Sequence, residues 1–428
     1  MKGIDKRTMA NQTFSNTLYT NDNLYVLSGM NSETVDLIYL DPPFNSKRLY
    51  SAPIGSKAAG ASFKDIWIWK DVDEYYLDAL ADKFPALAKY IATVGAIHSK
   101  PMMAYLTYMA QRIVEMHRIL KETGSLYLHC DPTAGHYLKL LLDGIFGKNN
   151  FRNEIVWCYT GGTDAKKTWQ KKHDILYFYT KTDKYMLNPC YEPFNESTIR
   201  RFNKTDEDGR KYKINQLKDG RITKTYMKED GKLAPDYWHF PIVNITSKEG
   251  TGYPTQKPLA LLKRIVLASS NEGDTVMDPF CGCATTCVAA QQLDRKWIGI
   301  DIETNVVNIL VERLTDASGI LFKDFVATDK IPKRSDVENI SRSDPTAKER
   351  LYKEQSGKCK GCGEEFKIVN LTIDHIVPKS KGGGDYYENY QLLCGSCNSI
   401  KGDRPMEFLR MKIEKREQMM KTQIVFGE

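Results

Sequence analysis

A rigid turn at residues 41–44, Asp-Pro-Pro-Phe, groups side chains that suit an amino group on a flat ring. It follows the apolar run VDLIYL, which predicts a buried strand that the prolines end. Pro42 and Pro43 fix their own φ angles, so the Pro42 carbonyl and the Asp41 carboxylate form a preset array of acceptors. Such an array can accept both hydrogens of an exocyclic amino group, with Phe44 stacked on the base. The alternative is a strand that simply stops beside a packed aromatic.

A second turn, TVMDPFCGC, offers its backbone to a ligand. It follows a predicted strand that ends at Asp278, and Gly282 lets a ligand approach the main chain closely. The next predicted strand, WIGID, ends at Asp301, an acidic residue where nucleotide-binding folds hold a ribose hydroxyl. A buried turn without a ligand is the alternative. The spacing favours a nucleoside pocket.

Four cysteines in two CxxC pairs predict a structural zinc site. Cys359 and Cys362 form the first pair, and Cys394 and Cys397 form the second. Four thiolates at this spacing bind Zn²⁺ tetrahedrally. The region after about residue 346 is too small to bury much core, so a metal staple makes physical sense. Coincidental free thiols are the alternative.

Two stretches resemble the S-adenosylmethionine (SAM)-dependent amino-methyltransferases of DNA. They are DLIYLDPPFN and the segment 253–301, from YPTQKP through DPFCGCATT to WIGID. The proline turn precedes the cofactor turn, which is the order of the circularly permuted β class, including type III modification subunits. The resemblance implies that Asp41, Pro42, Pro43 and Phe44 hold the target base. It also implies that SAM is bound by Asp22, Lys257, Pro258, Asp278, Pro279, Phe280, Gly282 and Asp301.

One position departs from the family pattern, and one residue type bears on the substrate. Ala284 stands where the family has a second glycine, and we expect SAM binding to survive because a helix-opening position tolerates alanine. In the family, Asp before Pro-Pro-aromatic is typical of N6-adenine methylation and Ser of N4-cytosine. The resemblance therefore favours adenine in double-stranded DNA, flipped out of the duplex, with N4-cytosine as the alternative.

The residues between the cysteine pairs resemble the HNH (ββα-metal) nucleases that carry a zinc knuckle. The resemblance covers Asp374-His375, Asn389 and Asn398. It implies that His375 is the general base, that Asn389 orients it, and that Asp374 and Asn398 bind Mg²⁺ or Mn²⁺. Some members carry His where Asn398 stands, and both residues can ligate a metal. A zinc module that only binds DNA is the alternative.

Predicted strands alternate with predicted helices, which favours an α/β fold with a mostly parallel, doubly wound sheet. With the resemblances, the chain is expected to be a Rossmann-like methyltransferase joined to a small zinc-stapled ββα-metal HNH domain. The predicted domains are the methyltransferase at 1–325, with a target-recognition region at about 160–250, a linker at 326–345 and the HNH module at 346–428.

The composition fits two or three globular domains. The 428 residues are 41% hydrophobic and 27% charged, and the net charge is 61 − 54 = +7, which permits a polyanionic partner without proving one. No run approaches the roughly 20 apolar residues that span a bilayer. The first 13 residues lack the apolar region of a signal peptide. We therefore expect a cytoplasmic protein of a prokaryote or phage, with thiols rather than disulfides.

The two sets of motifs together predict a bifunctional restriction–modification enzyme. The alternative is a DNA methyltransferase whose zinc module grips DNA without cutting it, and a module that cuts modified DNA is a third, weaker hypothesis. The sequence leaves the oligomeric state open, although homodimers are common in the family that the chain resembles. Basic residues in the target-recognition region would suit phosphates: Lys166, Lys167, Lys171, Lys172, Arg200, Arg201, Lys211 and Lys213.

Overall fold

The computed structural model describes residues 16–416, with gaps at 46–47, 54, 60, 66–76, 78–79, 82, 161–166, 245–246, 319–323, 382, 405, 407, 411 and 414–415. The first 15 residues, Lys166 and residues 417–428 therefore lie outside the described part of the chain.

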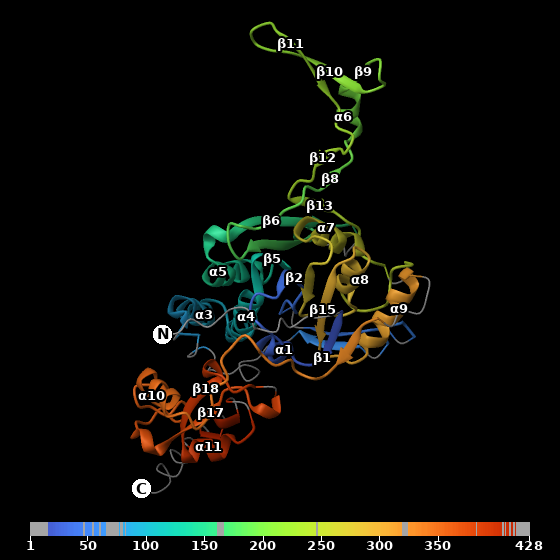
Figure 1. The fold of residues 1–428 in the computed structure, drawn as a ribbon. Helices are drawn as coiled ribbons and strands as arrows, with labels where there is room; N and C mark the ends of the chain where they lie inside the picture. Colours follow the sequence, from blue (N-terminus) through green and yellow to red (C-terminus); the bar gives the residue numbers. More distant parts are fainter. Residues whose placement is uncertain are drawn as a thin grey trace.

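A nine-stranded sheet forms the centre of the larger domain (Figure 1). The strand order is β13-β6-β7-β5-β2-β14-β15-β1-β16. Strand β7 runs antiparallel to both of its neighbours, and the other neighbouring pairs are parallel, which confirms the mostly parallel sheet. The strands are β1 (Thr17–Thr20), β2 (Val35–Leu40), β5 (Leu120–Cys130), β6 (Phe151–Cys158), β7 (His173–Thr180), β13 (Tyr237–His239), β14 (Thr275–Asp278), β15 (Lys296–Asp301) and β16 (Val326–Thr328).

Helices cover both faces of this sheet because successive strand residues point to opposite sides. In β2, Ile38 and Leu40 pack with one helical layer, and Leu37 and Tyr39 pack with the other. The first layer is α1 (Asn23–Gly29), α3 (Pro85–Ile97), α4 (Lys100–Ile119) and α5 (Gly135–Phe146). The second layer is α7 (Leu259–Ser269), α8 (Thr285–Gln291) and α9 (Val306–Ser318). No helix among the described residues is long and apolar enough to cross a bilayer.

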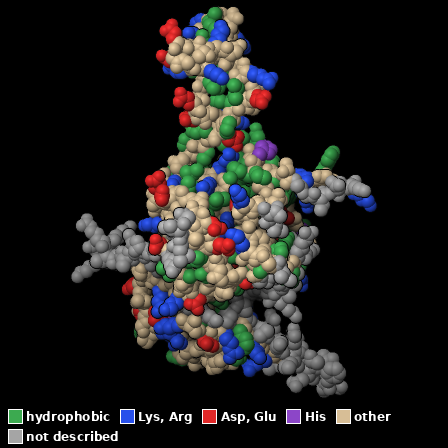
Figure 2. All heavy atoms as spheres, turned by 90° about the vertical axis from the view of Figure 1, so that its right-hand side faces the viewer, with side chains coloured by type: hydrophobic (Ala, Val, Ile, Leu, Met, Phe, Trp, Pro, Cys, Tyr) green, Lys and Arg blue, Asp and Glu red, His purple; other side chains and the backbone are tan. Residues whose placement is uncertain are grey.

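An arm projects from the sheet and lies within the predicted target-recognition region (Figure 1). It contains β8 (Tyr191–Glu192), α6 (Glu196–Arg201), β9 (Lys204–Thr205), β10 (Lys211–Gln216), β11 (Ile222–Tyr226) and β12 (Lys232–Leu233). Figure 2 shows the same projection, with basic and acidic side chains on its surface. The rest of the region is not separate from the fold, because β7 and β13 belong to the central sheet. A smaller hairpin, β3 (Arg48–Ser51) and β4 (Ser62–Asp65), follows the proline turn.

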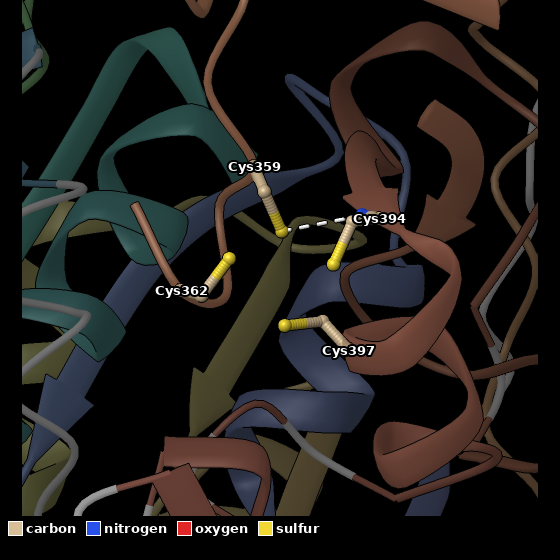
Figure 3. Close-up of side chains that lie close together, drawn as sticks. All are labelled: Cys359, Cys362, Cys394 and Cys397. Carbon is tan, nitrogen blue, oxygen red and sulfur yellow. Dashed lines mark hydrogen bonds between the residues drawn. The ribbon is translucent and has the colours of Figure 1, made fainter. Parts of the chain in front are cut away.

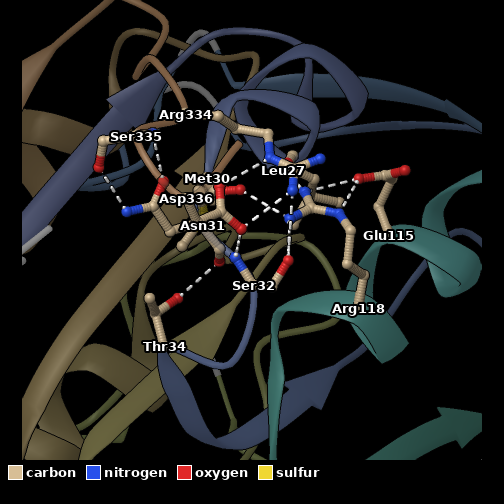
Figure 4. A network of polar contacts seen from close by, with 10 residues as sticks. All are labelled: Leu27, Met30, Asn31, Ser32, Thr34, Glu115, Arg118, Arg334, Ser335 and Asp336. Carbon is tan, nitrogen blue, oxygen red and sulfur yellow. Dashed lines mark hydrogen bonds and ion pairs between the residues drawn. The ribbon is translucent and has the colours of Figure 1, made fainter. Parts of the chain in front are cut away.

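The segment assigned to a linker, 326–345, begins with β16, which is the edge strand of the sheet. Its next residues are held on the loop after α1 (Figure 4). The Ser335 amide donates to Asn31 Oδ1 at 2.8 Å, and the Ser32 amide donates to Asp336 Oδ2 at 2.9 Å. A Cβ on Gly29 would lie 2.0 Å from the Pro332 carbonyl oxygen, so glycine permits this close approach.

The smaller domain has the ββα order of the predicted HNH module. Strands β17 (Leu371–His375) and β18 (Tyr390–Cys394) pair antiparallel, and α11 (Gly395–Lys401) follows them. Helix α10 (Pro345–Glu354) contributes Leu351 to a core with Leu371 and Leu392. The module lies at the end of the molecule away from the arm (Figure 1). Short 3₁₀ turns lie at Lys148–Asn150, Ile368–Asn370, Lys379–Lys381 and Tyr387–Asn389.

Candidate active sites

The carboxyl ends of neighbouring parallel strands bring the predicted methyltransferase residues to one edge of the sheet. There they surround a cavity of about 350 Å³. Pro258 is absent from its wall and instead precedes the first turn of α7. The wall holds the other predicted residues: Asp22, Asp41, Pro42, Pro43, Phe44, Lys257, Asp278, Pro279, Phe280, Gly282 and Asp301.

One side of the cavity is an acidic loop with its backbone turned inward. Asp301 Oδ2 accepts from the Gly282 amide at 2.8 Å. Asp278 accepts from the Thr286 hydroxyl at 2.5 Å and from the Phe280 amide at 3.1 Å. Gly282 has φ +50°, and a Cβ there would lie 3.0 Å from the Tyr253 ring, so glycine is needed on both counts.

The alanine that departs from the family pattern adopts an unusual conformation. Ala284 has φ +59° and ψ 33°, the left-handed region, where a residue with a Cβ is disfavoured by about 1–2 kcal/mol. The chain therefore reproduces a glycine-like backbone at this position, at a local energetic cost.

The two carboxylates of this loop favour a positively charged ligand. Burial raises the pKa of Asp278 to about 7 and that of Asp301 to about 6. A cation placed between them would restore their ionised forms. SAM is a nucleoside with a cationic sulfur, so its chemistry fits the donors, acceptors and charge that are present.

This electrostatic arrangement predicts the pH dependence of SAM binding. A cationic ligand favours the ionised carboxylates, so binding releases protons and affinity falls as pH falls through their raised pKa values. We expect affinity at pH 6 to be about tenfold or more below that at pH 8. Titration calorimetry at both values checks this. The Asp278→Asn variant should bind weakly at pH 8 and show a flatter profile, whereas equal wild-type affinities would contradict the assignment.

Asp22 is fixed by an arginine that motif analysis did not identify. Its Oδ1 accepts from the Leu24 amide at 2.8 Å, which caps α1, and from Arg112 Nη2 at 3.0 Å. Arg112 is buried in α4 and also donates to Asn23. The positions 22 and 112 meet only because α1 packs on α4.

The other side of the cavity is built on Asp41. Its Oδ2 contacts the ammonium of Lys257, and that ammonium also donates to the Thr255 carbonyl at 3.1 Å. Its Oδ1 is buried and has no hydrogen-bond partner. A buried acceptor without a hydrogen-bond partner is costly in a protein interior. Oδ1 is enclosed in the wall, 3.9 Å from His129 Nδ1, so a donor that reaches it when a ligand binds would satisfy it.

A polar chain lies behind Asp41 that motif analysis also missed. His129, fully buried in β5, lies 2.9 Å from the Tyr39 hydroxyl and 3.2 Å from Asp174 Oδ2. The Tyr159 hydroxyl donates to Asp174 Oδ1 at 3.2 Å. The ring centroid of His129 is 5.8 Å from that of Phe44, so these groups support the predicted base platform. The signal available was a histidine near the carboxyl end of a predicted strand.

The four cysteines of the smaller domain form one cluster (Figure 3). Their ligand atoms all lie within 4.8 Å of one another, which fits tetrahedral Zn²⁺ with sulfur ligands at about 2.3 Å. The amides of Gly361 and Cys394 donate to Cys359 Sγ at 3.3 and 3.2 Å, which favours its thiolate form. Among the described residues, these four cysteines form the cluster of three or more His, Cys, Asp or Glu side chains that could hold a metal ion.

Removing one cysteine ligand is expected to unfold the smaller domain. Structural zinc supplies on the order of 10 kcal/mol of folding free energy in small modules. The Cys394→Ser variant should lose about one zinc per chain by mass spectrometry of metals, together with the protection of β17 and β18 in hydrogen exchange. Cys190→Ser is the matched control because Cys190 lies outside the cluster. A Cys394 variant that retains both zinc and exchange protection would disprove the assignment.

The predicted general base has a partner that fixes its ring. His375 Nε2 lies 2.8 Å from Asp385 Oδ1, and the Tyr390 hydroxyl donates to the same oxygen at 3.1 Å. Although burial works against ionisation, hydrogen bonds from Lys379 and His375 lower the pKa of Asp385 to about 2. An ionised carboxylate only accepts, so Nε2 carries the proton and Nδ1 keeps the lone pair that a base needs.

The other predicted nuclease residues have different surroundings: Asn389 bonds the backbone, whereas Asp374 and Asn398 each keep one oxygen for a metal ion. Asn389 does not contact the imidazole; it bonds the backbone of Val377 and Gly384, and so shapes the loop after His375. Asp374 Oδ2 is paired with the buried Lys401 at 3.0 Å, so Oδ1 is the oxygen that remains for a metal ion. Asn398 uses its Nδ2 on Thr372, which leaves its oxygen. These two oxygens are the ligand type that Mg²⁺ or Mn²⁺ prefers.

A sheet with acidic loops at its carboxyl edge is the arrangement of SAM-dependent methyltransferases, and the ββα unit is that of HNH nucleases. Residues 35–312 match the family described as DNA methylase (N6_N4_Mtase), and residues 359–404 match HNH endonuclease. The chain therefore belongs to the DNA methylase family and carries an HNH endonuclease domain. Both resemblances drawn from the motifs are confirmed.

Curated relatives share most of the methyltransferase part. The chain is 30% identical over 303 residues to the DNA adenine methyltransferase YhdJ of Escherichia coli K12, covering 71% of this chain and 83% of YhdJ. It is 29% identical over 349 residues to the type II methyltransferase M.EcaI of Enterobacter cloacae, covering 70% and 69%. It is 23% identical over 357 residues to the Mod subunit of the StyLTI type III enzyme of Salmonella typhimurium, covering 68% and 52%.

Proposed function

We propose that this chain methylates the N6 amino group of adenine in double-stranded DNA with SAM, and that its HNH domain cuts DNA with Mg²⁺ or Mn²⁺. The two activities together would make it a bifunctional restriction–modification enzyme. The observation that carries the proposal is that Asp41, whose buried Oδ1 has no hydrogen-bond partner, lines the same cavity as Asp278 and Asp301. The group proposed to hold the base and the groups proposed to hold the cofactor thus line one space.

The methyltransferase residues act by orientation and charge. The target base leaves the duplex, because its amino group cannot otherwise enter the cavity. When bound, SAM supplies a methyl group on a positively charged sulfur. Asp41 Oδ1 and the Pro42 carbonyl accept the two amino hydrogens, which turns the nitrogen lone pair toward the cavity, and Phe44 stacks on the ring. As nitrogen gains the methyl group it releases one proton, for which Asp41 is the hydrogen-bonded acceptor.

Adenine is favoured over cytosine by the Asp before Pro-Pro-Phe and by the similarity to YhdJ, which is a DNA adenine methyltransferase. The same acceptors fit the N4 amino group of cytosine, which is the second candidate. For the HNH domain, the proposed cutting rests on His375, whose Nδ1 lone pair is left free by Asp385. A module that binds DNA without cutting is the competing hypothesis.

One experiment separates these alternatives. The full chain is incubated with unmethylated plasmid and SAM, with or without Mg²⁺, and the DNA is analysed on gels and by nucleoside mass spectrometry. We expect N6-methyladenine, and strand scission only with the metal. Pre-methylated plasmid should resist scission if the enzyme restricts unmodified DNA. Absence of any methylated nucleoside would refute the methyltransferase proposal, and methylation without scission would favour a DNA-binding module.

The arm is proposed to contact the DNA backbone. Its β10–β11 hairpin carries Lys211, Lys218 and Lys224 without an ion pair among the described residues, whereas Arg210 and Arg221 pair with neighbouring aspartates. The hairpin also holds Tyr212 beside Tyr226, with ring centroids 5.6 Å apart. Exposed cations flanking aromatic rings suit phosphates and bases.

Neutralising this hairpin should weaken DNA binding in a salt-dependent way. Replacing Lys211, Lys218 and Lys224 with alanine should reduce the slope of log K against log salt by about 2–3, since each phosphate contact contributes about 0.9. Fluorescence anisotropy from about 50 to about 300 mM salt measures this slope. Lys296→Ala is the control because Lys296 begins β15 at the edge opposite the cavity. An unchanged slope in the triple variant would exclude the arm from phosphate contact.

Two further expectations belong to the same proposal. The chain would act in the cytoplasm of a bacterium, where SAM and DNA are present together, and it would form a homodimer as family members do. Light scattering coupled to gel filtration tests the homodimer, for which a mass near 49 kDa would leave only the monomer.

A further inference from the structure

Lys257 and Asp41 form an ion pair in the cavity wall. Motif analysis assigned Lys257 to the cofactor, but its ammonium contacts Asp41 Oδ2 and the Thr255 carbonyl. A lysine ammonium has three N–H donors, so the two partners among the described residues leave one donor. Asp41 Oδ1 is an acceptor with no partner. Both residues line the cavity, so its wall holds a carboxylate acceptor beside an ammonium donor.

The bases of DNA divide into two groups by the hydrogen-bonding groups on their Watson–Crick edge. Adenine and cytosine present an amino donor beside a ring-nitrogen acceptor, N6 with N1 or N4 with N3. Guanine and thymine present a carbonyl acceptor beside an N–H donor. The acceptor–donor pair of Asp41 and Lys257 complements only the first group.

We propose that Lys257 is a specificity-determining residue that donates a hydrogen bond to the ring nitrogen beside the target amino group. Asp41 Oδ1 accepts from the amino group at the same time, so the pair reads two adjacent positions of one base. This inference rests on the proposed amino-methyltransferase function and names the part of the base that the site recognises beyond the amino group.

The surroundings of Lys257 hold its ammonium in place. Thr255 has φ +63°, a left-handed conformation that is strained for a β-branched residue, and its carbonyl accepts from Lys257. Gln256, between them, accepts from the Thr251 amide at 2.9 Å and donates to the Glu249 carbonyl at 2.8 Å. Lys257 itself is only 8% exposed. A loop fixed in this manner is suited to present one donor in a defined direction.

The charges of the cavity differ between the side proposed to bind the base and the side proposed to bind the cofactor. Lys257 and Asp41 neutralise each other, so the attraction for a cationic cofactor comes from Asp278 and Asp301. Contact with Asp41 keeps Lys257 on the side of the cavity where the base is proposed to lie.

The test uses base analogues in DNA with the unaltered full chain. Duplexes carry adenine, 1-deazaadenine or 3-deazaadenine at the target position; the first analogue lacks N1, and the second retains N1 but lacks a nitrogen elsewhere on the ring. We expect kcat/KM for 1-deazaadenine to fall about 10- to 100-fold, the range for a hydrogen bond to a charged group, mainly through KM. The 3-deaza control should stay within about threefold. If the methylated base is cytosine, 3-deazacytosine replaces 1-deazaadenine.

A variant of Lys257 provides a second test of the inference. In Lys257→Met the adenine and 1-deazaadenine duplexes should be methylated with the same kcat/KM, because the donor is gone. If that variant is inactive, the wild-type comparison alone decides. Equal wild-type rates on 1-deaza and 3-deaza duplexes would overturn the inference while leaving the proposed function intact. Loss of SAM binding in Lys257→Met together with equal wild-type rates would assign Lys257 to the cofactor. No methylation of ordinary DNA would instead refute the proposed function.

Discussion

Replacing Asp41 with alanine is expected to reduce methyl transfer to DNA by about 10³-fold or more while leaving SAM affinity nearly unchanged. In the proposed mechanism the carboxylate orients the amino nitrogen, and loss of one preorganised polar group at a reacting centre costs about 10²–10³. The misdirected lone pair adds to this loss. SAM is proposed to bind on the other side of the cavity, beside Asp278 and Asp301. Single-turnover methylation and calorimetry on the same preparation measure the two effects.

The control for this variant lies on the strand that Asp41 follows. Asp36 is in β2 and is also ion-paired, with Lys121 at 2.8 Å, but it is not part of the cavity wall. Asp36→Asn should therefore change the methylation rate little. An Asp41→Ala enzyme that methylates DNA within tenfold of the wild-type rate would show that Asp41 does not hold the base.

The second large effect is expected from His375→Ala, which should abolish metal-dependent DNA cutting. In the proposed mechanism the imidazole supplies the lone pair that activates water, and the contact with Asp385 fixes which nitrogen carries it. A loss of about 10³-fold or more in the cleavage rate is expected, with zinc content and methyl transfer unchanged. Plasmid nicking assays with Mg²⁺ and with Mn²⁺ measure the loss.

His136→Ala is the matched control for the nuclease, because His136 is exposed on α5 and belongs to the other domain. It should cut at the wild-type rate. If His375→Ala and His136→Ala cut equally, the base lies elsewhere, and if neither variant nor the wild type cuts, the HNH domain is a DNA-binding module.

The sequence was sufficient to predict the parts of the site that depend on local pattern. Short apolar runs ending at Asp41, Asp278 and Asp301 predict parallel strands, and residues after parallel strands meet at one edge of a sheet. The cysteine spacing likewise predicts a cluster because four thiolates and one metal impose their own geometry. The cavity wall and the sulfur cluster follow from these rules.

Contacts between distant segments were not predictable in this way. Lys257, just before α7, meets Asp41, just after β2, because α7 packs on the face of β2 that carries Leu37 and Tyr39, and no local pattern reports that packing. Asp174 reaches His129 because β7 enters the sheet antiparallel to β5, although its flanking polar residues suggested a separate recognition region. Lys401 pairs with Asp374 only after α11 packs on β17. Each case depends on tertiary packing, which overrides local composition.

The most direct test of one shared cavity for base and cofactor is single-molecule sequencing of DNA from a methylation-free bacterial host that expresses the full chain. A site in which the proline turn delivers an amino group to SAM predicts N6-methyladenine at one defined sequence, absent when Asp41 is alanine. Unmodified DNA, or methyl groups on ring carbon instead of an exocyclic nitrogen, would contradict that arrangement.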